Sequence, residues 1–463
     1  MGTAGRALAQ DPSESSLAAA SAAIRARAIS PTELTKVCLH KIQKLNPAVN
    51  AFITVMETEA LAQARQLEDD LARGKWRGPM HGIPVALKDL IDTAGTRTTA
   101  ASAVFANRVP VADAEVVKRL KSAGAILLGK LNMHEFAYGG TSDVTHFGPV
   151  RNPWSLQHSP GGSSGGSGAA VAARMCFGAV GTDTAASIRT PASCCGIVGM
   201  KPTYGRVSTR GVIPLSWSLD HVGPMCRTVE DAALMLEAMA GFDASDSSTL
   251  DAPVPHYAES LGNPTSQLRI GVPVRMYWED LDPEVERIAK EALRLLVSLT
   301  GEPREMQLPA VDNLTIADAE AYAFHKPYIE KTPQLYSPPI RERLLAGANV
   351  SSRAYIEAKR EMERWRREIG GAFEDVDVIV TPTMPVQPVK VGSGSDLVLI
   401  RNTNAFDVFG LPTISIPCGF TEAGLPVGLQ ITGPHLDEAT VFQLAHAYEQ
   451  ATEWSRRRPP LLN

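Results

Sequence analysis

One segment rich in glycine, serine and alanine constrains this chain more than any other, and it runs from residue 159 to residue 206. It contains two serine-bearing turns, GGSSGGS at residues 161–167 and GTDTAAS at residues 181–187. Glycine lets backbone amides approach a ligand closely, and serine hydroxyls can act as nucleophiles or as hydrogen-bond donors. The segment therefore predicts the catalytic centre of a serine hydrolase that acts on amides.

The composition is that of a soluble globular protein, and it argues against nucleic acid as the main partner. Of the 463 residues, 44% are apolar and the formal net charge is −5, whereas nucleic-acid binding favours a basic surface. The basic triplet Arg456-Arg457-Arg458 is expected to be a solvated tail.

Cysteine spacing and hydropathy indicate the compartment. Six cysteines lie without C-x-x-C spacing, which favours a reduced, cytoplasmic protein. No apolar run reaches the roughly 18 residues that a membrane-spanning helix needs, so no membrane contact is expected. The first ten residues contain Ala7-x-Ala9 without an apolar stretch before it, so an intact signal peptide is not expected.

Apolar stretches of strand length alternate with segments of helical periodicity. Strands are predicted at residues 83–87, 124–129, 177–180, 268–272, 376–381 and 413–417. Helices are predicted at residues 13–28, 30–46, 57–73, 114–123, 169–174, 282–298, 354–374 and 439–452. Ser30 and Glu33 are spaced as a capping box, and Ser13 or Ser15 could cap the first helix. Nearly all-apolar strands alternating with helices favour an α/β fold whose sheet is covered on both faces.

Three local matches to known motifs are interpreted as coincidences. Gly124–Lys130 fits G-x-x-x-x-G-K, but Leu131 stands where a phosphate-binding loop needs a hydroxyl for magnesium. GGSSG at residues 161–165 fits G-x-S-x-G, but a polar, proline-broken segment precedes it instead of a strand. His134 lacks the second histidine of H-E-x-x-H. Neither a metal nor another cofactor is expected.

A serine nucleophile needs a base, because its hydroxyl is a weak nucleophile at its ordinary pKa. Lys88 is a candidate because it follows an apolar strand, and burial can hold a lysine neutral. Keeping lysine neutral at pH 7 costs about 4–5 kcal/mol relative to its ordinary pKa. Two alternatives remain open at this point: a surface ion pair of Lys88 with Asp89 or Asp92, and a Ser-His-Asp triad using His221 or His435.

Segments spread over most of the chain carry a family resemblance. They are HGIPVALKDLIDTAGTRTTAAS, LLGKLNMHEFAYGGTSDVTHFGPVRNPW, the two serine turns with the KPTYGR that follows them, SLDHVGPMCRTVEDAA, and NAFDVFGLPTISIPCGFTEAGLPVGLQITGP. This composite set closely resembles the amidase signature family. The resemblance implies a single α/β domain with a central mixed, twisted sheet covered by helices on both faces.

The resemblance also implies a triad of two serines and a lysine. In it Ser187 is the nucleophile, Ser163 follows a cis peptide bond and relays the proton, and Lys88 is the base. The relay would return the proton to the leaving amine of an acyl-enzyme reaction. Asp183 and Arg189 are expected to brace the loop before the nucleophile.

The turn before Ser187 is expected to supply the oxyanion hole from the backbone amides of Thr184, Ala185 and Ala186. Here Ala-Ala replaces the Gly-Gly that is commoner in the family. Ordinary backbone dihedrals are expected at both alanines, because a side chain at positive φ costs about 1–2 kcal/mol.

The resemblance places the substrate against the segment that precedes the first serine turn. The expected binding residues are Met133, Tyr138, Gly139, Gly140 and Thr141. An aromatic group between residues 275 and 350 is interpreted either as core filler or as a lid over an apolar pocket. Its members are Tyr277, Trp278, Tyr322, Phe324, Tyr328 and Tyr336.

The expected function is a free-standing amidase for small hydrophobic or aryl carboxamides, with esters, anilides and carbamates as further substrates. The alternative is the glutaminase (A) subunit of a tRNA-dependent amidotransferase. The expected partner is a small-molecule amide, with no nucleic acid and a monomeric or homodimeric protein. One domain over residues 1–463 is expected. Its parts are N-terminal helices at 13–75, a signature core at 80–245, a variable substrate-covering region at 265–350 and a C-terminal return at 351–463.

Overall fold

The computed structural model of the chain describes residues 11–311, 314–394 and 396–462. The expectation about a signal peptide in the first ten residues lies outside these ranges. Within them, no helix combines the length and the apolar character needed to cross a membrane.

A single mixed sheet of eleven strands forms the centre of the fold, in the order β1-β3-β2-β4-β6-β5-β10-β11-β9-β7-β8. The strands are β1 (Phe52–Val55), β2 (Pro84–Lys88), β3 (Ile126–Leu131), β4 (Gly178–Asp183), β5 (Val198–Lys201), β6 (His221–Cys226), β7 (Ile270–Pro273), β8 (Arg304–Met306), β9 (Val378–Pro382), β10 (Thr413–Phe420) and β11 (Pro426–Thr432). β2 pairs in parallel with β3 and β4, whereas β4, β6, β5, β10, β11 and β9 pair antiparallel in turn. The α/β fold is confirmed.

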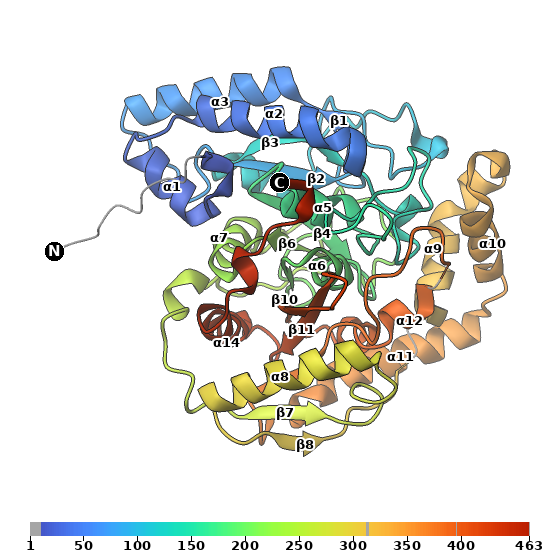
Figure 1. Cartoon of the computed structure of the whole chain (residues 1–463). Helices are drawn as coiled ribbons and strands as arrows, with labels where there is room; N and C mark the ends of the chain where they lie inside the picture. The colour runs from blue at the N-terminus through green and yellow to red at the C-terminus, as the bar shows by residue number, and fades with distance from the viewer. Residues whose placement is uncertain (1–10, 312–313, 395, 463) are drawn as a thin grey trace.

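Helices surround this sheet (Figure 1). They are α1 (Leu17–Arg25), α2 (Pro31–Val49), α3 (Glu57–Ala72), α4 (Glu115–Ser122), α5 (Gly165–Ala172), α6 (Arg189–Cys195), α7 (Val229–Met239), α8 (Pro283–Leu299), α9 (Leu314–Ile329), α10 (Pro338–Gly347), α11 (Ser352–Glu368), α12 (Asp396–Ile400), α13 (Asn404–Val408) and α14 (Glu438–Gln450). Figure 1 shows α2 and α3 along one end of the molecule and α8 beside β7 and β8 at the other end.

Two glycines of β4 show that both faces of the sheet are covered. A Cβ on Gly178 would meet Met235 of α7 at 2.7 Å, and a Cβ on Gly181 would meet Ser164 at 3.0 Å and Ile188 at 3.1 Å. Residues separated by an odd number along a strand point to opposite faces. One face of β4 is therefore covered by α7, and the other by the two serine-bearing turns.

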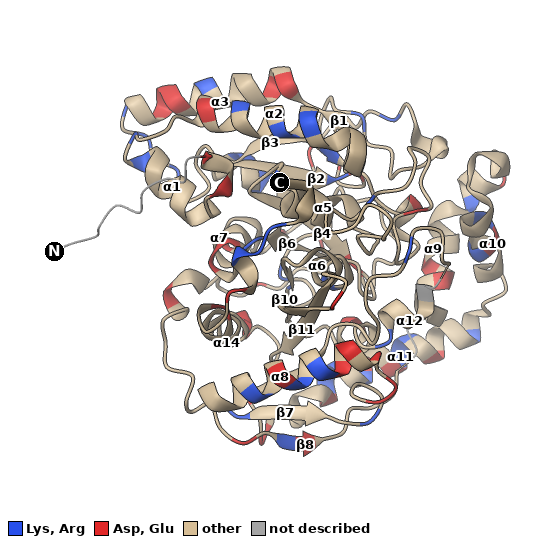
Figure 2. Ribbon diagram, in the orientation of Figure 1, with Lys and Arg blue, Asp and Glu red and all other residues tan. Residues whose placement is uncertain are grey.

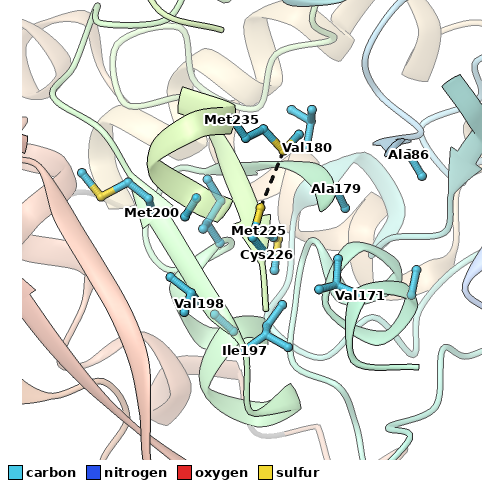
Figure 3. Packing of buried hydrophobic residues seen from close by; sticks show 14 of the residues in the cluster. Ala86, Val171, Ala179, Val180, Ile197, Val198, Met200, Met225, Cys226 and Met235 are labelled. Atoms are coloured by element: carbon cyan, nitrogen blue, oxygen red, sulfur yellow. Dashed lines mark hydrogen bonds between the residues drawn. The ribbon is translucent and has the colours of Figure 1, made fainter. Parts of the chain in front are cut away.

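The core beneath the serine turns consists of small and sulfur-containing side chains. Figure 3 shows Ala179, Val180, Val198, Met200 and Met225 packed between β4, β5, β6 and α7. All five are fully buried. Flexible methionine side chains fill the irregular spaces that small residues leave in such a core.

Local signals gave most helix limits. The capping box of Ser30 and Glu33 is present at the start of α2. The cap of α1 is Ser16 rather than Ser13 or Ser15, since Ser13 lies in a short 3-10 helix that Asp11 caps. α5 begins at Gly165, four residues before the predicted start, because its glycines fit the tight packing around it.

Several strands were not predicted, notably β5, β6 and β11. Each is antiparallel to its neighbours, and each contains glycine, with proline in β6 and β11. Glycine and proline weaken the local signal of a strand. Pairing with neighbours distant in sequence decides these strands.

Candidate active site

Lys88 lies at the end of β2 and is fully buried. Its Nζ lies 2.7 Å from Oγ of Ser163 and 2.8 Å from Oγ1 of Thr182. Burial lowers the pKa of Lys88 from 10.5 to about 7, against the opposing charges of Asp220 and Asp183. A lysine with this pKa is partly neutral at pH 7 and can accept a proton from a hydroxyl.

The alternatives to a buried lysine are wrong. Asp89 accepts hydrogen bonds from the amide and hydroxyl of Thr99, and Asp92 pairs with Arg108 at 2.5 Å. Nδ1 of His221 lies 2.6 Å from the carbonyl oxygen of Leu219. Nε2 of His435 lies 2.8 Å from the carbonyl oxygen of Phe409. These hydrogen bonds turn both imidazoles toward backbone carbonyls rather than toward a serine.

Ser163 is held by its backbone as well as by Lys88. The peptide bond between Gly162 and Ser163 is cis, as the family resemblance implied. The carbonyl oxygen of Ser163 accepts hydrogen bonds from the amide of His134 at 3.1 Å and from Oγ of Ser142 at 3.2 Å. A Cβ on Gly162 would lie 2.8 Å from the amide nitrogen of Thr141, so this approach requires glycine.

Ser187 ends the loop that follows β4. It is 8% exposed and lines a pocket. In the described ranges, the amides of Ala185, Ala186 and Ser187 donate no hydrogen bond to another protein group. Neither alanine has a positive φ, so the expected ordinary dihedrals are confirmed. This loop presents unused backbone donors beside a hydroxyl.

Thr184 connects the same loop to a second buried acid. Its Oγ1 donates a hydrogen bond to Asp220 at 2.6 Å. Burial raises the pKa of Asp220 to about 7, against the hydrogen bond from Thr184. Asp220 and Thr182 were not predicted as site residues. Thr182 could have been recognised inside GTDTAAS, whereas Asp220 becomes a neighbour only through the β4–β6 pairing.

Asp183 and Arg189 form a buried ion pair under the loop. Nε of Arg189 lies 2.9 Å from Oδ2 of Asp183, and the amide of Ile188 donates to the same oxygen at 3.1 Å. The Arg189 guanidinium holds the pKa of Asp183 well below its usual range despite burial. Arg189 also pairs with Asp407 of α13 and donates to the carbonyl of Thr403 at 2.8 Å.

The pocket in front of Ser187 is built from distant parts of the chain. It is lined by Ala137, Tyr138, Gly139, Gly140, Thr184, Ala185, Ser187, Leu215, Leu314, Ala317, Arg343, Leu397 and Ile400. Met133 and Thr141, also expected here, are buried behind it. Residues 215, 314, 317, 343, 397 and 400 were not predicted, because no local pattern marks them.

Arg343 is the charged side chain among the described lining residues. Its guanidinium carbon lies 4.0 Å from the ring centre of Tyr138, and its Nε lies 3.9 Å from Asp318. The hydroxyl of Tyr138 donates a hydrogen bond to Asp318. Tyr138 and Asp318 thus hold the guanidinium at the wall of the pocket.

The predicted aromatic residues do not line this pocket. Tyr277 packs on Phe406, and the indole of Trp278 donates to the carbonyl of Val380 at 3.4 Å. Phe324 and Tyr328 pack together. These contacts agree with the interpretation as core filler rather than as an aromatic lid.

Neither a metal nor a cofactor is needed to explain the observed contacts. Within residues 11–311, 314–394 and 396–462, no group of three His, Cys, Asp or Glu side chains is placed to hold a metal ion. The absence of both groups stays a prediction.

The arrangement of a buried lysine, a serine after a cis peptide bond and a serine on a loop of free amides agrees with the sequence match. A family model described as Amidase matches residues 33–442. The chain belongs to the amidase family. Its members cleave amide bonds, so the chain is an enzyme of that class.

Relatives and solved structures share nearly the whole chain. The A subunit of the glutamyl-tRNA(Gln) amidotransferase of Moorella thermoacetica is 41% identical over 466 residues, which are 94% of this chain and 96% of that protein. The crystal structure of the corresponding protein from Thermotoga maritima has a TM-score of 0.76 and 35% identity, covering 93% of this chain and 94% of that one. A peptide amidase bound to chymostatin has a TM-score of 0.85 and 31% identity, covering 96% and 99%.

These relatives overturn two expectations from the sequence. The free-standing amidase for small hydrophobic carboxamides is wrong, because relatives at about 40% identity over the full length are named as components of an amidotransferase. The expectation of a lone protein with no nucleic acid is wrong for the same reason, since that name includes other subunits and a tRNA. Both errors came from residues that the whole family shares, which report the chemistry and not the partner.

Proposed function

We propose that the chain is the glutaminase (A) subunit of a glutamyl-tRNA(Gln) amidotransferase in the cytoplasm. It hydrolyses the side-chain amide of glutamine to glutamate and ammonia for use by a partner protein that handles tRNA. The observation that carries this proposal is the 41% identity to such a protein over 94% of the chain. The 2.7 Å contact between Lys88 and Ser163 supports the chemistry.

In the proposed mechanism, neutral Lys88 takes the proton of Ser163 as Ser163 takes the proton of Ser187. Oγ of Ser187 then bonds to the amide carbon of glutamine. The backbone amides of Thr184, Ala185 and Ala186 stabilise the resulting oxyanion, and loss of such a donor costs about 2.7–4 kcal/mol. The proton returns through Ser163 to the leaving nitrogen, which departs as ammonia. Water then cleaves the acyl-enzyme by the same relay.

The pocket suits glutamine in shape and in charge. Leu215, Leu314 and Ala317 line it with apolar surface for the two methylenes, and Arg343 supplies a guanidinium for the α-carboxylate. Segment 265–350, which contains Leu314, Ala317 and Arg343, is proposed to be the part of a single domain that covers the substrate.

The direct test is glutamine hydrolysis by the purified chain, alone and with the co-expressed partner proteins from its own genome. We expect glutaminase activity that the Ser187→Ala variant loses while its circular dichroism spectrum stays that of the wild type. Formation of amidated tRNA should require the partners. A chain that ignores glutamine in both settings would contradict the proposal.

Arg343→Met tests the substrate. We expect KM for glutamine to rise by about tenfold or more, because a charge-assisted hydrogen bond contributes about 1.5–3 kcal/mol. Hydrolysis of propionamide, an uncharged analogue of the reacting end, should keep the wild-type kcat/KM. An equal loss on both amides would assign Arg343 a role in folding rather than in glutamine binding.

A further inference from the structure

A second, larger cavity of about 610 Å³ lies on another part of the molecule. Its described lining comes from the N-terminal segment, α7, α14 and the C-terminal tail, and it shares no residue with the pocket at Ser187. Figure 1 shows the C-terminal tail passing α7 toward the region of α1, and Figure 2 shows basic residues along that tail. The proposed reaction leaves this cavity unexplained.

Arginines dominate its wall. Four arginines line the cavity, and they are Arg174, Arg227, Arg456 and Arg458. The carboxylates on the same wall are Glu14, Glu230 and Glu449. Burial raises the pKa of Glu449 to about 8, so this group is largely neutral at pH 7. The wall therefore carries more positive than negative charge.

One carboxylate, Glu14, neutralises several of these cations at once. Its Oε2 lies 2.6 Å from Nε of Arg174 and 3.2 Å from Nε of Arg458. Its Oε1 also accepts a hydrogen bond from Lys41 at 3.2 Å. A single negative charge shared among three cations leaves a positive potential in the cavity.

Arg174 is the most constrained member of this cluster. It is 6% exposed and has a positive φ of 56°. Its two Nη groups donate no hydrogen bond to the described protein groups, although they belong to a side chain that borders the cavity. Burial and the neighbouring Arg227 lower the pKa of Arg174 to about 10. Buried donors without acceptors are unfavourable, and an anion would supply the acceptors.

The basic triplet that the sequence suggested to be a solvated tail is divided between two surfaces. Arg456 and Arg458 line the cavity. The guanidinium carbon of Arg457 lies 4.0 Å from the ring centre of Phe420 instead. Arg457 is therefore a matched control for Arg458 in the same tail.

We propose that this cavity binds a small anion that carries a phosphate group. Guanidinium groups present paired N–H donors that match phosphate oxygens, and a dianion balances the excess charge of the wall. The cavity is larger than one phosphate ion, whose space is near that of a few waters of roughly 30 Å³ each. The shared chemistry is the phosphate group, free or as an ester of a small molecule.

The test is isothermal titration of the full chain at pH 7 and constant ionic strength, with inorganic phosphate and separately with ribose 5-phosphate. We expect saturable binding at one site per chain. Tighter binding of ribose 5-phosphate would identify an ester as the ligand type, and equal binding would identify free phosphate; both support the site. Absence of saturable binding for both anions would overturn it.

Variants locate the anion. Arg174→Gln should weaken binding by roughly tenfold or more, since each hydrogen bond to a charged group contributes about 1.5–3 kcal/mol. Arg458→Ala, on the partly exposed rim, should also weaken it and decides the matter if Arg174→Gln does not fold. Arg457→Ala and Arg343→Met should bind as the wild type does. Wild-type binding by Arg458→Ala, or loss of binding in Arg343→Met, would overturn the assignment.

Discussion

Lys88 is the residue whose behaviour depends most on its surroundings. It is 0% exposed, and its amine contacts two hydroxyls, those of Ser163 and Thr182. Neither hydroxyl carries a charge, so little opposes the desolvation that lowers the lysine pKa. The same side chain on a solvated strand end would stay protonated.

We expect kcat/KM for glutamine to rise with pH through a midpoint at about 7. The pKa of Lys88 is lowered to about 7, and the lysine acts as a base when it is neutral, so activity is lost as pH falls below this value. One pH unit below the midpoint, activity should be about tenfold lower than the plateau. A pH–rate profile between pH 5.5 and 8.5 measures this.

Asp220→Asn separates Lys88 from the nearby acid. The charge of Asp220 raises the pKa of Lys88, so its removal should move the midpoint to lower pH. Asp220 itself has a pKa of about 7. A midpoint that disappears in this variant would assign the titration to Asp220 instead.

At the scale of elements, α5 shows why the segment is built from small residues. The amide of Gly166 donates to the carbonyl of Asn132 at 3.0 Å. A Cβ on Gly166 would lie 2.8 Å from the carbonyl oxygen of Ala51 and closer still to that of Asn132. The helix can lie against the backbone beside β3 because it lacks side chains there.

Gly166→Ala should therefore destabilise the fold by about 1–3 kcal/mol, the usual range for overpacking a core. Chemical denaturation of the purified variant measures the free energy of unfolding. Gly262→Ala is the control, because a Cβ there meets no atom within 4 Å, and it should change stability by less than about 1 kcal/mol. Equal effects of both substitutions would contradict this account of α5.

At the scale of the whole molecule, Arg189 joins parts of the chain that are far apart in sequence. It binds Asp183 at the end of β4 and Asp407 in α13, and all three side chains are fully buried. The loop with Ser187 lies between these contacts. The C-terminal part of the chain thus supports the loop that carries the proposed nucleophile.

Arg189→Met should destabilise the protein by about 3–5 kcal/mol, because it leaves two buried carboxylates without their partner. Thermal unfolding followed by circular dichroism measures the change. Arg287→Met removes an exposed pair with Glu291 at 3.3 Å, and such pairs contribute about 0–1 kcal/mol. A stable Arg189→Met variant would show that the ion pair does not support the fold.

The sequence by itself determined the features that depend on neighbouring residues. The strand before Lys88, the capped start of α2 and the two serine turns are recognised from residues a few positions apart. Family motifs assigned the reaction class, but they are common to free amidases and to the glutaminase components of amidotransferases, so the first choice of function was wrong.

Only the tertiary structure decided the features that require distant residues to meet. The low pKa of Lys88 depends on β2, the Ser163 turn and β6 closing around it. Arg343 reaches the pocket from α10, and the arginine cavity joins both ends of the chain through the 3.2 Å contact of Arg458 with Glu14. Desolvation and charge act through space, and no local pattern records which side chains will share that space.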